Sequence, residues 1–291
     1  MRTLKRKKGN GEFYYLQNSF RKNGKVVTRE KYLGKEIPPN IEAIKREFSI
    51  ESEKVLYHEL EKIRNDFQAE WKKIPESVKN KHLEEISIAF TYNTNAIEGS
   101  TITLEETREI IHDKIAPNKP LLDIKETESH SKVFLEMLSK KQKISNQIIL
   151  EWHKNIFSES KPDISGKYRD YLVKIGDYLA PDWQDVRILM KKLIEFINKN
   201  KTAELNSVML CARVHYKFEK IHPFGDGNGR IGRLIMNKIL WDNGYPMIII
   251  EKKKRKSYYK ALRKEEDEFV KYFVRKYIAV HKRRINNQFL I

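Results

Sequence analysis

The sequence has little of what would place a protein in a membrane or an oxidising compartment. Its 291 residues contain a single cysteine, Cys211, which excludes an intrachain disulfide and whose apolar neighbours predict a buried thiol. No apolar run approaches the roughly 18 residues of a membrane span, and the N-terminus lacks the apolar stretch of a signal peptide. The eight histidines show no paired spacing of metal ligands, and internal repeats are absent. We therefore expect a cytoplasmic protein that does not associate with a membrane.

The net charge of +18 is concentrated at the two ends of the chain. Residues 1–40 contain 11 Lys and Arg against 3 Asp and Glu, residues 251–291 contain 14 against 5, and the stretch between them is almost neutral. Basic ends attract nucleic acid, an acidic protein or a membrane surface, but a composition rich in Lys and Glu is also typical of soluble thermophilic proteins. We favour a solvated surface, with binding of an acidic partner as an open alternative. Nucleic acid is disfavoured because no helix-turn-helix or zinc-ligand pattern is present.

The first 38 residues differ in pattern from the rest of the chain. Segments that favour β-structure at Arg2–Lys8, Glu12–Phe20 and Lys25–Leu33 are separated by Asn10-Gly11 and Asn23-Gly24, both of which are type I′ turn signals. This pattern predicts a three-stranded antiparallel meander. We assign residues 1–38 to a small basic β-module and residues 39–291 to a second domain.

The second domain has the apolar period of helices in nearly every segment. A long helical region begins near Ile41, and residues 201–219 carry an apolar stripe that ends just before His222. Residues 229–243 follow as another helix that Gly244 ends, and residues 257–262 and 268–284 complete the set. The fold class that we expect is mainly α, with the β-module in front of it.

The most informative segment is the twelve-residue run HPFGDGNGRIGR, which begins at His222. Its glycines let the backbone approach an anion closely, and the helix that follows directs its N-terminus at the same place. Arg230 and Arg233 are three residues apart, so both guanidinium groups rise from nearly the same face and suit successive phosphates. The run therefore predicts a phosphate-binding site.

Asp226 and His222 give this run chemistry beyond binding. A carboxylate among phosphate-binding groups is explained by a divalent cation, because Mg²⁺ prefers hard oxygen ligands and bridges to phosphate oxygens. His222 is the one group there whose ordinary pKa is near neutrality, which makes it the natural general base. Taken singly, these residues are better explained as a surface histidine and solvated charges. Their combination indicates a site that handles a nucleotide phosphate.

The same run resembles the signature of the Fic family, His-Pro-Phe-x-Asp/Glu-Gly-Asn-Gly-Arg-x-x-Arg, without a departure. The resemblance implies a Fic-fold helical bundle and a protein adenylyltransferase, which moves AMP from ATP to a Ser, Thr or Tyr hydroxyl of a target protein and requires Mg²⁺. It implies roles for the following residues: His222 as the base, Asp226 as the Mg²⁺ ligand, Gly227, Asn228 and Gly229 around the α- and β-phosphates, Asn228 and Arg230 as side-chain ligands, and Arg233 at the γ-phosphate.

A second run, TNAIEG from Thr94 to Gly99, resembles the inhibitory motif of that family, Ser/Thr-x-x-x-Glu-Gly/Asn. The resemblance implies an inhibitory helix at about residues 87–98, N-terminal to the core, in which Glu98 pairs with Arg233 and takes the place of the γ-phosphate. The enzyme would then be autoinhibited. Whether Glu98 also supports removal of AMP stays open, as does a role for Glu98 as an ordinary carboxylate in the last helical turn.

Residues 166–181 resemble the flap of the family, a β-hairpin that would hold a target segment by main-chain hydrogen bonds. The β-module is similar to modules in front of some archaeal members. Two other functions stay open: a Fic-fold phosphotransferase, which the retained Gly229 and Arg233 disfavour, and a non-catalytic regulator that binds a nucleotide or nucleic acid, which His222 and Asp226 disfavour. Family members often dimerise, so a homodimer is also open, and the sequence does not identify the target protein.

Overall fold

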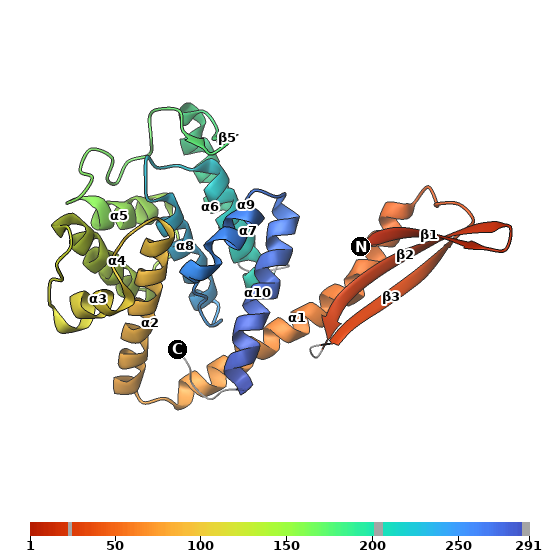
Figure 1. The fold of residues 1–291 in the computed structure, drawn as a ribbon, viewed down its shortest axis with the longest axis horizontal. Coiled ribbons are helices and arrows are strands. Elements are labelled where there is room, and N and C mark those ends of the chain that lie inside the picture. The colour runs from red at the N-terminus through yellow and green to blue at the C-terminus, as the bar shows by residue number, and fades with distance from the viewer. Residues whose placement is uncertain (23–24, 201–205, 287–291) are drawn as a thin grey trace. The chain divides into compact units, whose positions relative to one another are not determined.

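The computed structural model describes residues 1–22, 25–200 and 206–286, which fall into two compact units, Met1–Lys62 and Ile63–Ile291 (Figure 1). The boundary between the units lies inside helix α1 (Ile41–Lys73). The division of the chain into domains at residue 38 stays a prediction.

The first unit contains the three-stranded antiparallel sheet that the sequence predicts. Its strands are β1 (Arg2–Lys8), β2 (Gly11–Lys22) and β3 (Lys25–Gly34), in the order β1-β2-β3. The first turn lies one residue earlier than predicted, because Lys8 pairs with Gly11 and leaves Gly9 and Asn10 as the turn residues. Gly9 has a φ of +59°, which glycine adopts without steric cost. The second predicted turn, Asn23-Gly24, lies outside the described residues.

The second unit is helical with one short hairpin, as the sequence predicts. After α1 come α2 (Glu76–Ile97), α3 (Leu104–Arg108), a π-helical turn (Glu109–Asp113), α4 (Leu121–Ser139) and α5 (Asn146–Phe157). The hairpin of β4 (Lys174–Ile175) and β5 (Tyr178–Leu179) follows, and then α6 (Val186–Asn200), α7 (Ser207–Ile221), α8 (Asn228–Asp242), α9 (Arg255–Leu262) and α10 (Glu266–Asn286). Residues 201–205, which the sequence includes in the helix before His222, lie outside the described residues.

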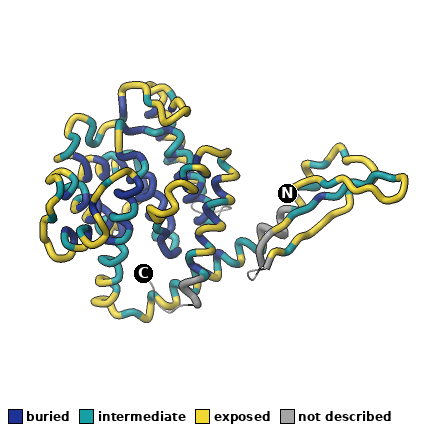
Figure 2. Tube along the Cα trace, viewed as in Figure 1, coloured by how far each residue is buried: buried dark blue, intermediate teal, exposed yellow. Residues whose placement is uncertain are grey.

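Helices α7 and α8 form the centre of this unit. The helices α6 and α10 pack on α7, and α2, α4 and α5 pack on α8 (Figure 1). Nearly every residue of α8 is buried, as the dark blue tube of Figure 2 shows. Each large apolar side chain that is fully buried contributes about 1.5–3 kcal/mol to folding, so the loop between α7 and α8 is anchored at both ends by the core. No helix within the described ranges is both long and apolar enough to cross a membrane.

Candidate functional site

A short loop between α7 and α8 contains the signature residues. It begins at His222, which ends α7 in a left-handed conformation with φ 49° and ψ 61°, a conformation that costs energy for a residue with a side chain. At the other end, the Asn228 side chain accepts a hydrogen bond from the Phe224 N–H at 2.9 Å and donates one to the Phe224 carbonyl at 2.8 Å. Gly227, at φ +78°, permits the turn between them. The loop is therefore held in one shape by its own hydrogen bonds.

His153, on α5, supports this loop from outside the signature. Its ring stacks on the ring of Phe224, with 3.9 Å between centroids and 9° between planes. Its Nδ1 accepts from the Gly166 N–H at 2.9 Å, so its Nε2 carries the proton and donates to the Asp226 carbonyl at 3.0 Å. Burial lowers the pKa of His153 to about 4, which keeps the ring neutral at neutral pH and preserves this pattern of donor and acceptor.

The N-terminus of α8 provides an anion site at the same loop. The first hydrogen bond inside α8 runs from the Ile231 N–H to the Gly227 carbonyl at 3.0 Å, so the N–H groups of residues 228–230 are those that a helix leaves without an internal acceptor. Together with the helix dipole they attract negative charge. The Glu98 carboxylate lies against this site, since a Cβ built on Gly229 would be 2.1 Å from Glu98 Oε1. Only glycine at position 229 lets an anionic oxygen come so close.

Residues at the end of α2 hold the Arg233 side chain, which is 1% exposed. Its Nη2 donates to Glu98 Oε1 at 2.6 Å and to the Thr94 carbonyl at 3.2 Å, and its Nε donates to Thr94 Oγ1 at 2.6 Å. The Tyr259 hydroxyl donates to the other oxygen of Glu98 at 3.3 Å. Gly99 follows with φ +106° and ends the helix. The contact between Glu98 and Arg233 that the resemblance implied is present in the structure.

The charges of Glu98 and Arg233 stabilise each other. Burial by itself would raise the pKa of Glu98, but the charge and hydrogen bond of Arg233 outweigh it and hold that pKa below its usual value. Burial would also lower the pKa of Arg233, and Glu98 instead raises it. Both groups are therefore charged at neutral pH. Because the arginine is removed from water, the Coulomb attraction between the two charges is stronger than in an exposed ion pair.

Asp226 and Arg230 belong to a ring of alternating charges, which we call the charge ring. Its other members are Glu126, on α4, and Lys161, which follows α5. Glu126 accepts hydrogen bonds from Arg230 Nη1 and from Lys161 Nζ. Asp226 Oδ2 lies 3.3 Å from Lys161 Nζ and 3.7 Å from Arg230 Nη2. The Arg230 guanidinium also lies 4.3 Å from the centroid of the Phe157 ring. Arg230 is thus oriented by both α4 and α5.

The Asp226 carboxylate is suited to act as a ligand of Mg²⁺. Burial would raise its pKa, but the Arg230 charge and the Gly227 N–H outweigh that effect and lower the pKa. Its side chain is 50% exposed, so the oxygens are ionised and accessible. Across the described parts of the chain no group of three or more His, Cys, Asp or Glu residues could hold a metal. Mg²⁺ usually takes one or two carboxylates together with substrate phosphates, and one carboxylate beside an anion site fits that use.

The His222 ring is in the form that a general base needs. Burial is the main reason that its pKa is lowered to about 4, and the charges of Glu98 and Asp226 act on the ring in the opposite direction. The ring is therefore neutral at neutral pH and able to accept a proton.

Arg169 connects the hairpin to the signature loop. Its side chain donates to the carbonyls of His222 at 2.8 Å and Pro181 at 2.6 Å, and its main-chain N–H donates to the Pro223 carbonyl at 2.9 Å. The hairpin itself is exposed, with Leu179 at 60%. A two-stranded hairpin is therefore present where the sequence resembles the flap, and its base is tied to the main chain of His222.

The structure brings every predicted site residue together at one junction. Thr94, Glu98 and Gly99 lie at the end of α2, and His222, Asp226, Gly227, Asn228, Gly229, Arg230 and Arg233 lie in the loop and the first turns of α8. Both amide atoms of Asn228 bond to Phe224, so the role of this amide as a phosphate ligand stays a prediction and its main-chain N–H is the group at the anion site. Sequence reasoning missed Glu126, His153 and Lys161, because isolated residues of these types form no spacing pattern. Arg169 lies in the segment that resembles the flap, but no role was predicted for its side chain.

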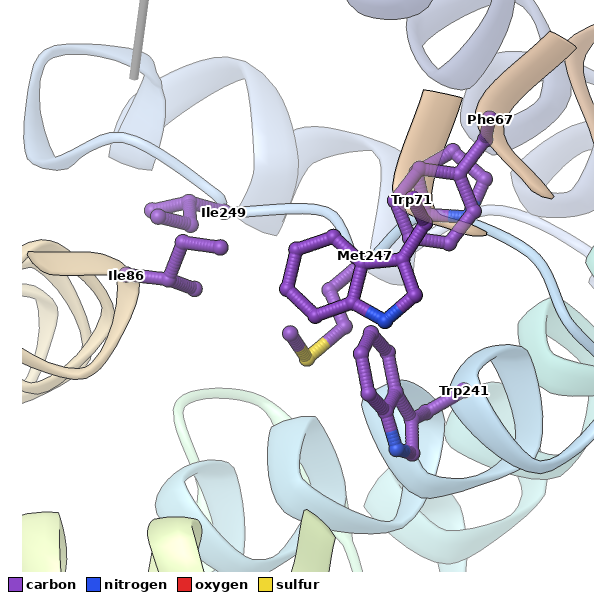
Figure 3. A pocket seen from close by; sticks show the side chains of 7 residues that line it. Phe67, Trp71, Ile86, Trp241, Met247 and Ile249 are labelled. Atoms are coloured by element: carbon purple, nitrogen blue, oxygen red, sulfur yellow. The ribbon is translucent and has the colours of Figure 1, made fainter. Parts of the chain in front are cut away.

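A small apolar pocket is lined by other residues. They are Phe67, Trp71, Ile86, Trp241, Pro246, Met247 and Ile249 (Figure 3). The rings of Trp71 and Trp241 meet edge to face, with 5.5 Å between centroids. The pocket shares no lining residue with the signature and has no charged side chain, so it does not contribute to the phosphate site.

Comparisons with known proteins agree with this geometry. Residues 143–240 match the Fic/DOC family. The protein adenylyltransferase Fic of Drosophila ananassae is 34% identical over 193 residues, which cover 63% of this chain and 38% of that protein. The protein of the same name from Drosophila melanogaster is 35% identical over 193 residues, with the same shares of 63% and 38%. The chain therefore spans less than half the length of these relatives.

The fold is shared with solved structures over most of the chain. Fic-1 from C. elegans has a TM-score of 0.69 and 27% identity, and the match covers 86% of this chain and 78% of that one. The similarity therefore extends well beyond residues 143–240 and includes helices on both sides of the signature loop. The chain has the Fic fold, and over residues 143–240 it is similar to the Fic/DOC family.

Proposed function

We propose that this chain is a protein adenylyltransferase and that Glu98 of the same chain holds it in an inhibited state. The observation that carries the proposal is the meeting of three groups at one loop: the neutral ring of His222, the exposed carboxylate of Asp226 and the N-terminus of α8. A base, a metal ligand and an anion site are what transfer of a nucleotide to a hydroxyl requires. The names of the relatives agree with this activity.

The loop and α8 would position the triphosphate of ATP. The N–H groups of residues 228–230 suit the α- and β-phosphates, and Arg230, which Glu126 orients, lies beside them. Arg233 is the cation farther along the helix and suits the γ-phosphate. Fixed donors of this kind lower the barrier by positioning and by neutralising charge, because they are oriented before the reaction begins.

The hydroxyl oxygen of the target protein would attack the α-phosphorus. His222 takes the proton of that hydroxyl as the new bond between oxygen and phosphorus forms. The bond from the α-phosphorus to the oxygen that bridges to the β-phosphate breaks, and pyrophosphate leaves. Mg²⁺ held by Asp226 would neutralise charge on the phosphates. The products are a protein that carries AMP and free pyrophosphate.

Glu98 opposes this reaction because it contacts two groups that would bind the nucleotide. Its carboxylate neutralises Arg233 at 2.6 Å and lies against Gly229 at the N-terminal end of α8. A γ-phosphate cannot take the same place without displacing it. ATP therefore binds in a productive orientation only when Glu98 moves away from Arg233.

The exposed hairpin is the surface that would hold the target. A hairpin with free main-chain groups can align an extended segment by adding a strand, which demands little of the sequence of that segment. Because Arg169 joins the base of the hairpin to the His222 carbonyl at 2.8 Å, a segment bound there would present its hydroxyl near the base.

Labelled ATP tests the proposal directly. The Glu98→Gly variant is incubated with Mg²⁺ and ATP that carries the label either on the α-phosphate or on the γ-phosphate. Labelling of protein from α-labelled ATP alone supports adenylyl transfer. Labelling from γ-labelled ATP alone would show a phosphotransferase instead, and the absence of both, with ATP bound, would show a regulatory binding protein.

A further inference from the structure

Lys161 lies outside the signature and the inhibitory motif, yet it contacts the carboxylate that suits Mg²⁺. Its Nζ donates to Glu126 and lies 3.3 Å from Asp226 Oδ2. The side chain is 30% exposed, and its ammonium lies 5.1 Å from the centroid of the Phe157 ring. The candidate metal ligand is thus already paired with a cation of the protein.

The exposure of the four side chains separates a buried half of the charge ring from an accessible half. Glu126 and Arg230 are 12% and 7% exposed, whereas Asp226 is 50% exposed. Glu126 contacts both cations and anchors them, and Asp226 faces the same two cations from the solvent side. The two carboxylates and two cations balance, so the ring has no net charge.

A divalent cation bound to Asp226 alone would upset this balance. It would add two positive charges beside the ammonium of Lys161 and the guanidinium of Arg230, and like charges a few ångströms apart repel each other strongly where water is partly excluded. A triphosphate changes the sign of the effect, because its oxygens provide new anionic partners. The four-carbon stem of a lysine lets its ammonium move from one anionic partner to another. The planar guanidinium of Arg230 moves less readily, because both Glu126 and the Phe157 ring orient it.

We infer that Lys161 is a further nucleotide-binding residue, whose ammonium passes from Asp226 to the phosphates when Mg²⁺ and ATP bind together. The inference rests on the proposed function. It makes the two ligands depend on each other: Lys161 weakens the binding of Mg²⁺ alone and strengthens the binding of nucleotide. Each ligand then raises the affinity for the other by the same factor, which we call the coupling factor.

Calorimetric titration measures this factor without any chemical turnover. The Glu98→Gly chain, in which the phosphate site is open, is titrated with α,β-methylene-ATP with and without Mg²⁺, and with Mg²⁺ alone. Lys161→Gln removes the positive charge and keeps a donor for Glu126, so the ring is not left with an unpaired buried carboxylate. We expect this variant to bind Mg²⁺ alone more tightly and to reduce the coupling factor on the order of tenfold.

Two matched variants separate this role from a structural one. Lys161→Arg keeps the charge and should retain most of the coupling. Lys125→Gln removes one positive charge from α4, at the residue before Glu126. Lys125 lies 3.9 Å from the exposed Glu159, so this variant should leave the coupling unchanged. If Lys161 only braces the loop, Lys161→Gln lowers the unfolding temperature and leaves the coupling factor as it was, which would overturn the inference. Failure of the proposed function has a different signature: the analogue binds with the expected coupling, yet no AMP is transferred to protein when ATP replaces the analogue.

Discussion

Replacing Glu98 should have opposite effects on stability and on activity. The Glu98→Gln variant removes the charge that faces Arg233 at 2.6 Å and keeps a side chain of the same size. If Glu98 inhibits by occupying the partner of the γ-phosphate, the same loss that destabilises the fold must release the site. A purely structural carboxylate would show only the first effect.

The structure sets the size of both effects. The side chains of Arg233 and Glu98 are 1% and 29% exposed, and removal of one partner of a buried pair costs about 3–5 kcal/mol. Arg233 keeps its two hydrogen bonds to Thr94, so we take the lower end, about 3 kcal/mol. In a unit of this size that loss lowers the unfolding temperature by roughly 6–12 °C. In the parent, the free energy of the Glu98–Arg233 contact opposes productive binding of the nucleotide. Without that opposition, the rate of transfer should rise by about 100-fold.

Two measurements on the same protein check this prediction. Differential scanning calorimetry gives the unfolding temperature of the parent and the variant, and incorporation of α-labelled AMP into the protein gives the rate. Added Mg²⁺ and α,β-methylene-ATP should restore much of the lost stability in the variant, because the γ-phosphate gives Arg233 a new anionic partner. Glu105→Gln, an exposed carboxylate on α3, is the control for the loss of one charge and should change neither quantity.

The reasoning is refuted by a lower unfolding temperature together with an unchanged or reduced rate of labelling. That result would mean that Glu98 stabilises the junction of α2 and α8 without obstructing the nucleotide. An increase in rate without a loss of stability would show that the ion pair is weaker than its burial indicates.

Three further predictions follow from the site. His222→Ala should abolish transfer of AMP while calorimetry shows unchanged binding of α,β-methylene-ATP, because the ring acts on the target hydroxyl; transfer at the parent rate would remove the assignment as base. Asp226→Asn should eliminate the effect of Mg²⁺ on binding of the same analogue, and an effect as large as that of the parent would place the metal elsewhere. The free energy of unfolding should fall as the pH drops from about 6.5 to about 4, because burial lowers the pKa of His130 and His215 to about 3 and that of His153 and His222 to about 4, so the unfolded chain binds more protons. Glu219 acts in the opposite direction, since burial raises its pKa to about 7 and the folded chain holds that proton, but one group does not offset four histidines. Equal denaturant midpoints at pH 7 and pH 5 would contradict this prediction.

Much of the fold could be predicted because its signals are local. Segments that favour β-structure, with turn signals between them, predict the three strands, and the apolar period places α8, α9 and α10 within about two residues of their observed bounds. The π-helical turn at Glu109–Asp113 was not predicted. It brings the consecutive residues Ile110 and Ile111 into one buried cluster with Ile88, Ile102 and Ile124, and only the packed neighbours of these residues require that arrangement.

The site, like the fold, has residues that the sequence predicts and residues that it does not. The residues that contact the proposed nucleotide form one short run, so their order and spacing indicate a phosphate site with a base and a metal ligand. The residues that support them do not. Nothing in the sequence around His153 or Arg169 shows that the first bonds to the Asp226 carbonyl or that the second bonds to the His222 carbonyl, because each contact joins segments that meet only in the folded chain.

The sequence by itself determined the chemistry of the loop, since twelve adjacent residues carry the glycines, the carboxylate, the histidine and both arginines. The tertiary structure decided which charges face one another. Glu98 and Arg233 are separated by 135 positions, Glu126 and Arg230 by 104, and Glu126 and Lys161 by 35. The resemblance implied the first of these pairs, and the other two had no signal. The energy of an ion pair depends on the distance between its atoms and on the water around them, and folding alone determines both.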